Sequence, residues 1–230
     1  MIGLFDPLYF IILAPGIAIT IWATIKVKNT FRRYNNVPVR SGRTGRQAAE
    51  HLLARQGVRI PVEEHPGSLS DHYDPRVRAL RLSPEVYHGR SIGAVAVAAH
   101  EVGHALQHHA EYRPLMMRQT LARPAAFASS VSWIVLFGGI LLGMAGLIEV
   151  GIALFSVVVL FQLVTLPVEL NASKRAKRLV VDSGLVAGHE QAGVSRVLTA
   201  AAMTYVAGAL TSVLTLVYYL LRSGLLASDD

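Results

Sequence analysis

Cysteine is absent from this 230-residue sequence, and charged residues are scarce. Without cysteine the chain can form neither a disulfide nor a thiolate zinc site, so any metal must be held by histidine and carboxylate side chains. Asp, Glu, Lys and Arg make up only 16% of the residues, whereas an average soluble domain has about 25%. Together with a hydrophobic content of 52%, this shortage of charge predicts a membrane protein.

Four long runs contain almost no charge, and each has the roughly 18 apolar residues that a bilayer crossing needs. They cover residues 7–25, 127–148, 150–168 and 197–221. Only Glu149 and Gly151 interrupt the second and third runs, so residues 127–168 are expected to form a tight transmembrane hairpin. The first run is followed, not preceded, by basic residues and lacks a cleavage site, which favours a retained anchor over a signal peptide.

Clusters of Lys and Arg follow the first run, precede the second and follow the third. With four spans, these clusters lie on one side of the membrane, and the positive-inside rule makes that side cytoplasmic. Arg222 is the one cation expected on the opposite side. The net charge of +7 therefore indicates topology and contact with membrane lipids, and no nucleic-acid-binding pattern accompanies it.

Two polar segments, residues 26–120 and 169–196, are expected at the cytoplasmic face. In the first, residues 44–57 predict a helix capped by Thr44, and residues 91–109 predict a longer one. Residues 58–64 and 68–85 predict strands, with Leu80 to Leu82 as an edge to which an extended peptide could add. The predicted fold is mostly α, with four transmembrane helices and a small α+β zincin-like cytoplasmic domain.

The stretch "HEVGHALQHH" begins at His100 and contains the pattern H-E-x-x-H. His100 and His104 are one helical turn apart on the same face, so their imidazoles can converge on one metal ion. Glu101 is then placed to reach a metal-bound water. His108 continues the series, but it lies roughly 12 Å along the helix axis from His100, which disfavours it as a third ligand.

Glu169 in "LPVELNASKRA" is the candidate third ligand. It follows the third apolar run, and a hairpin of two spans would return it to the side on which the motif helix ends. Three protein ligands and one open position are typical of catalytic zinc. The alternative is a structural glutamate paired with Lys174 or Arg175.

Several ordered blocks, among them "VKNTFRRY", "LRLSPEVYHGRSI", "AAHEVGHALQH" and "FQLVTLPVELNAS", resemble the YugP-type neutral zinc metallopeptidases of bacterial membranes. The resemblance covers nearly the whole chain, and a looser one extends to the HtpX-type and CaaX-prenyl membrane proteases. It supports Glu169 as a zinc ligand. The E-x-x-A-D motif of these proteases ends here in Ser173 instead of Asp, which leaves Asn171 or Ser173 as a neutral acceptor behind a zinc histidine.

The expected function is that of a zinc metalloendopeptidase of the bacterial plasma membrane whose active site faces the cytoplasm. Zn²⁺ on His100, His104 and Glu169 would activate a water, and Glu101 would serve as general base in cleaving a protein or peptide substrate. His72, Tyr73 and His189 are candidates for contacting the oxyanion.

Three other functions compete with this prediction. A site-2-type intramembrane protease would carry its motif inside a long span, but residues 92–99 are too short for one, and the spans contain no Asp. A transporter is disfavoured because charges are missing from the span interiors. A non-catalytic scaffold with a structural metal, closed by a fourth ligand such as His108, remains the alternative. The sequence leaves the physiological substrate, the oligomeric state and any regulatory partner open.

Overall fold

The computed structural model describes residues 6–223, and these divide into two compact units. The helical unit comprises the chain up to Trp22, residues 116–167 and the chain from Thr204 onward. The mixed unit comprises residues 23–115 and 168–203, and it contains all the strands described below.

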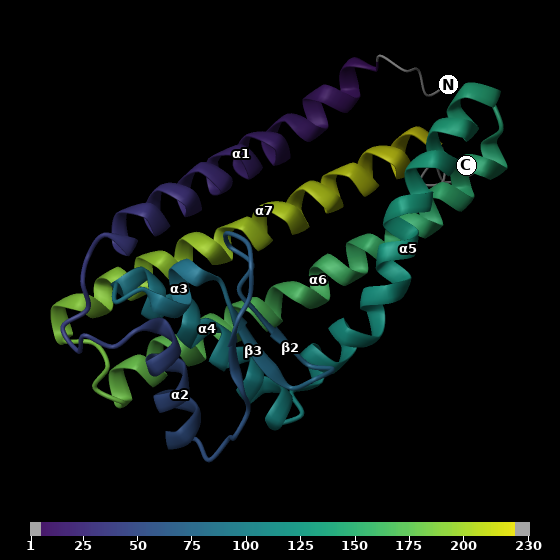
Figure 1. Cartoon of the computed structure of the whole chain (residues 1–230). Helices are drawn as coiled ribbons and strands as arrows, with labels where there is room; N and C mark the ends of the chain where they lie inside the picture. Colours follow the sequence, from purple (N-terminus) through teal and green to yellow (C-terminus); the bar gives the residue numbers. More distant parts are fainter. Residues whose placement is uncertain (1–5, 224–230) are drawn as a thin grey trace. The chain divides into compact units, whose positions relative to one another are not determined.

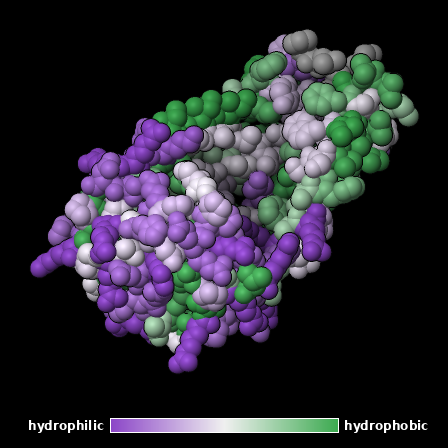
Figure 2. Space-filling view, viewed as in Figure 1, coloured by the Kyte–Doolittle hydropathy of each residue, from purple (hydrophilic) through white to green (hydrophobic). Residues whose placement is uncertain are grey.

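Four long helices supply the helical unit and continue into the mixed unit (Figure 1): α1 (Pro7–Asn35), α5 (Arg113–Leu142), α6 (Ala145–Asp182) and α7 (Gln191–Ser223). Among the described residues, these four are long and apolar enough to cross a membrane. Many of their large apolar side chains face outward, including Ile134 at 73% and Leu141 at 76% exposure, and apolar residues dominate the visible surface of this unit (Figure 2). The length and apolar character of these helices confirm the prediction of a membrane protein with four candidate spans.

The turn between α5 and α6 lies earlier than the sequence suggested. It is centred on Gly143, whose φ of +66° favours glycine, whereas Glu149 and Gly151 lie inside α6. A Cβ at Gly151 would come within 2.6 Å of Leu136, and one at Gly139 within 2.8 Å of Ile148. These glycines therefore bring α5 and α6 together within the chain, which is the role that small residues play between membrane helices.

The mixed unit begins with α2 (Gly45–Arg55), where Thr44 and Gln47 form the expected reciprocal cap. The strands β1 (Val62–Glu64), β2 (His72–Asp74) and β3 (Ala79–Leu82) form one small sheet in the order β1-β3-β2. β3 pairs in parallel with β1 and antiparallel with β2. The prediction of an edge strand at Leu80 to Leu82 is therefore wrong, because β1 and β2 cover both sides of β3.

The short helix α3 (Pro84–His88) leads into α4 (Ile92–His109), the central helix of the mixed unit. Ser91 caps α4 by accepting a hydrogen bond from the Ala94 N–H. Fourteen of its residues are buried, and α2, α3, β2 and β3 all contact it (Figure 1). Small residues on α4, such as Ala98, Ala99 and Gly103, permit this close packing. Hydrophilic side chains predominate on the visible outer surface of the unit, with a few hydrophobic patches between them (Figure 2).

Candidate metal centre

The side chains of His100 and His104 converge as the helical spacing predicts. Their Nε2 atoms lie 3.2 Å apart, with the two rings nearly perpendicular. Both belong to α4, whose burial limits the room that either ring has to turn. One face of this helix therefore presents two imidazole nitrogens to the same point.

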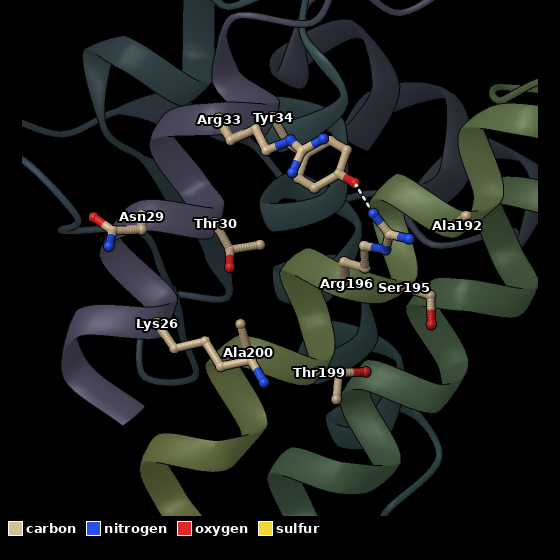
Figure 3. A pocket seen from close by; sticks show the side chains of 10 residues that line it. All are labelled: Lys26, Asn29, Thr30, Arg33, Tyr34, Ala192, Ser195, Arg196, Thr199 and Ala200. Atoms are coloured by element: carbon tan, nitrogen blue, oxygen red, sulfur yellow. Dashed lines mark hydrogen bonds between the residues drawn. The ribbon is translucent and has the colours of Figure 1, made fainter. Parts of the chain in front are cut away.

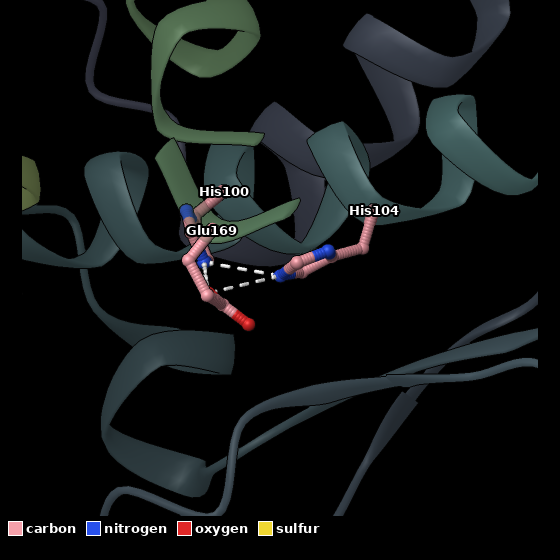
Figure 4. Close-up of side chains that lie close together, drawn as sticks. All are labelled: His100, His104 and Glu169. Atoms are coloured by element: carbon pink, nitrogen blue, oxygen red, sulfur yellow. Dashed lines mark hydrogen bonds and ion pairs between the residues drawn. The ribbon is translucent and has the colours of Figure 1, made fainter. Parts of the chain in front are cut away.

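Glu169 reaches this point from α6 (Figure 4). Its Oε2 atom lies 3.2 Å from Nε2 of His100 and 3.4 Å from Nε2 of His104, and the residue is only 1% exposed. α6 continues without a break through Pro167, so Glu169 is inside a helix and not in a loop after the span. The predicted juxtaposition of these three residues is found in the structure.

Gly103 makes this approach of α6 to α4 possible. A Cβ at position 103 would lie 2.7 Å from the carbonyl oxygen of Ala172 and 3.2 Å from its Cα. Both are backbone atoms, so any larger residue would push the two helices apart. Gly103 was not predicted as a contact residue, although its place between the two histidines was a signal.

The three donor atoms have the spacing that zinc requires. Tetrahedral ligands at about 2.0–2.1 Å from an ion lie roughly 3.3–3.4 Å from one another. The observed separations are 3.2, 3.2 and 3.4 Å. Within residues 6–223, this is the group of histidine and acidic side chains close enough to share an ion. Two neutral imidazoles and a carboxylate also match the ligand chemistry of zinc.

Gln107 determines which nitrogen of His104 faces the centre. Its amide nitrogen donates to the Val168 carbonyl oxygen at 2.8 Å and to Oδ1 of Asn171 at 3.0 Å. Both amide protons are thus used, so Oε1 must accept the Nδ1–H of His104 at 3.0 Å. The lone pair of His104 is then on Nε2, where a metal would bind.

Ser173 and Asn171, the two neutral acceptors expected behind a zinc histidine, contact different residues. Ser173 Oγ is 3.2 Å from Nδ1 of His100. Asn171 contacts Gln107 instead, and its Oδ1 also accepts a hydrogen bond from Nε of Arg175 at 2.8 Å. Ser173, which stands where the E-x-x-A-D motif has Asp, therefore contacts one of the three donor residues. Gln107 was missed, although it lies one helical turn beyond His104.

Glu101 is buried beside the metal centre, with 7% of its surface exposed. Burial raises the pKa of its carboxyl to about 7; the His100 charge opposes this rise, and the Glu169 charge adds to it. The backbone of Tyr73 in β2 acts in the opposite direction and lowers this pKa. Glu101 is therefore a buried carboxyl with a raised pKa, and it is not one of the three donor groups.

The remaining candidates lie apart from the three donor atoms. His108 Nδ1 is bonded to the Tyr73 hydroxyl at 2.8 Å, and burial lowers its pKa. His72 Nδ1 is paired with the Ser70 carbonyl oxygen at 2.7 Å. His189 is exposed on the short 3₁₀ helix Gly188–Glu190.

Comparisons with known proteins show the family to which the chain belongs. The family described as "Putative neutral zinc metallopeptidase" matches residues 9–224 of the chain. The "Putative membrane protease YugP" of Bacillus subtilis (strain 168) is 47% identical over 215 residues, which cover 93% of this chain and 96% of the Bacillus protein. No solved structure matches the chain. With a match that covers nearly all of its length, the chain belongs to the neutral zinc metallopeptidase family.

Proposed function

We propose that this protein is a membrane-bound zinc endopeptidase in which His100, His104 and Glu169 hold the metal and Glu101 is the general base. One observation carries the proposal: three donor atoms at tetrahedral zinc separations, with a buried carboxyl adjacent to them. Family membership supports the same chemistry.

Each ligand has a defined task in this proposal. Nε2 of both histidines and Oε2 of Glu169 would bind the ion, while Gln107 and Ser173 hold the rings from behind. Zinc bound there would supply a Lewis acid that polarises the scissile carbonyl and lowers the pKa of a coordinated water.

Glu101 performs the proton transfers. Its carboxylate takes a proton from the attacking water as the C–O bond forms, and returns it to the departing amine as the C–N bond breaks. A pKa near neutrality suits both steps, because the group must accept a proton and then release it. β2 is an edge strand that packs against α4, so its free side is the edge that an extended substrate would follow.

A cytoplasmic active site is part of the proposal. It rests on the basic residues that surround the ends of the apolar runs within the mixed unit, among them Lys28, Arg32, Lys174 and Arg178. Retention of such clusters on the cytoplasmic side is the usual rule for membrane proteins.

A structural metal in a non-catalytic scaffold is the competing function. Structural zinc sites are usually closed by four protein ligands. Among the described residues, the donor group has three members, and His108 is engaged with Tyr73. A coordination position left to solvent or substrate favours the peptidase.

The deciding experiment compares the wild type with Glu101→Gln, both purified as full chains in detergent, on an unfolded fluorogenic protein substrate, with zinc quantified in each. We expect both to bind zinc and only the wild type to cleave, with cleavage abolished by a chelator. If the wild type bound zinc but cleaved no substrate, the non-catalytic scaffold would be favoured. If Glu101→Gln lost its zinc, Glu101 would be a ligand.

A further inference from the structure

A cavity of about 670 Å³ lies in the mixed unit between α1 and the start of α7 (Figure 3). It is separate from the metal centre, and none of its lining residues belongs to α4 or α6. Its volume lies within the range of small-molecule sites. The proposed peptidase mechanism makes no use of it.

The lining of this cavity is cationic. Lys26, Arg33 and Arg196 contribute three positive charges, and no Asp or Glu is among the lining residues. Asn29 and Ser195 add an amide and a hydroxyl that can donate hydrogen bonds. Such a combination suits an anion with several oxygen atoms, because charge-assisted hydrogen bonds to phosphate are the strong ones.

Tyr34 orders two of these cations. Its hydroxyl oxygen accepts a hydrogen bond from Nη1 of Arg196 at 3.2 Å, and Cζ of Arg33 lies 5.8 Å from its ring centroid (Figure 3). The ring fits against α7 because position 193 is glycine, where a Cβ would come within 2.8 Å of it. Tyr34 thus contacts both guanidinium groups, and such contacts lower the entropic cost of binding because they restrict the side chains before a ligand arrives.

The cavity coincides with the ends of two apolar runs. Lys26 directly follows the run that ends at Ile25, and Arg196 directly precedes the run that begins at Val197. Ile25 itself is 55% exposed, which leaves an apolar surface beside the cations. At such a boundary the phosphates of the lipid headgroups and the first methylenes of the acyl chains meet the protein.

We propose that this cavity binds a phosphate ester, supplied by the headgroup of an anionic phospholipid. The guanidinium groups of Arg33 and Arg196 contact the phosphate oxygens, and the acyl chains extend along the apolar part of α1. This site goes beyond the proposed peptidase activity and does not depend on it.

Binding can be measured by native mass spectrometry of the delipidated full chain, titrated with phosphatidylglycerol or phosphatidylcholine. We expect saturable binding of phosphatidylglycerol, and a loss of roughly tenfold or more in Arg33→Gln/Arg196→Gln, because each cation near a lipid surface contributes appreciably to affinity. Ala192→Glu, which places a carboxylate at an exposed position in the lining, should weaken binding without disturbing the core.

The matched control is Arg32→Gln/Arg178→Gln, which removes the same charge from exposed positions outside the cavity. It should retain the affinity of the wild type; equal losses in both double variants would overturn the proposal.

Soluble glycerol phosphate identifies the source of the ester. Weak binding of it supports the lipid, whereas binding as tight as that of the lipid would overturn the lipid assignment. If phosphatidylcholine bound as tightly as phosphatidylglycerol, the charge argument would be wrong.

Discussion

At the scale of single residues, neutral side chains make hydrogen bonds to the histidines of the three-donor group. Arg175 donates to Asn171, whose oxygen also accepts from Gln107, and Gln107 in turn accepts from His104. Each hydrogen bond fixes the orientation of the next group. Through this series of hydrogen bonds, Arg175 affects the tautomer of His104, although Arg175 is not one of the three donor residues.

Gln107→Ala tests this chain of contacts. Removal of the acceptor leaves the Nδ1–H of His104 without its partner in a buried setting, and outer-sphere changes of this kind typically cost about 10–100-fold in metal affinity. We expect a zinc affinity weaker by that factor, measured by competition with a chromogenic chelator. Gln56→Ala, at an exposed position after α2, is the control, and an equal affinity in both variants would refute the role of Gln107.

Glu169→Gln tests the third ligand at nearly constant volume. The variant replaces the anionic ligand with a neutral amide, so we expect the purified protein to lose most of its zinc while it stays folded. Metal analysis together with circular dichroism checks this result. Glu149→Gln, on the exposed first part of α6, should keep full zinc occupancy. Full occupancy in Glu169→Gln would exclude it as a ligand.

At the scale of elements, the site exists because two helices approach at one glycine. α4 contributes both histidines and α6 the glutamate, and Gly103 contacts the backbone of Ala172 between them. Because the contact joins backbone to backbone, no change of rotamer can relieve a larger residue there.

Gly103→Ala should therefore separate the two helices. We expect a destabilisation of about 1–3 kcal/mol, the range for overpacking a core, together with a loss of zinc affinity. Thermal unfolding and zinc titration measure these effects. Gly146→Ala is the matched control, since this helical glycine in α6 has open space around its Cβ position, and alanine there should be neutral or slightly stabilising. Unchanged zinc binding in Gly103→Ala would contradict the expected separation.

At the scale of the whole molecule, the distribution of Lys and Arg along the chain supports the proposed orientation in the membrane. Arg222 was the exception to the positive-inside pattern. In the structure its Nε lies 2.7 Å from Oδ2 of Asp6, and the Tyr218 hydroxyl donates to the same oxygen. The charge of this exceptional cation is thus balanced within the helical unit, which leaves the rule intact for the remaining clusters.

Single-cysteine labelling can test the proposed topology, because the natural chain has no cysteine to interfere. Gln56→Cys lies in the mixed unit, and Met144→Cys lies at the turn between α5 and α6. In intact cells we expect a membrane-impermeant maleimide to label Met144→Cys alone, and to label both after permeabilisation. Labelling of Gln56→Cys in intact cells would reverse the orientation.

Much of this architecture could be predicted from the sequence because its patterns are local. Apolar length identified the spans, and the capping residues identified the helix that starts after Thr44. The turn at Gly143 and the central position of β3 were not predicted. In both cases the outcome depends on which partner packs alongside, and alternation or composition within one segment does not contain that information.

The sequence by itself determined that two histidines share a helical face and that a glutamate follows an apolar run, since both facts depend only on spacing along the chain. The tertiary structure decided that Glu169 meets those histidines at the separations zinc requires, and that Gln107 and Ser173 stand behind them. These contacts join residues far apart in the chain. They depend on how closely α4 and α6 can approach, and the packing of Gly103 against Ala172 sets that distance.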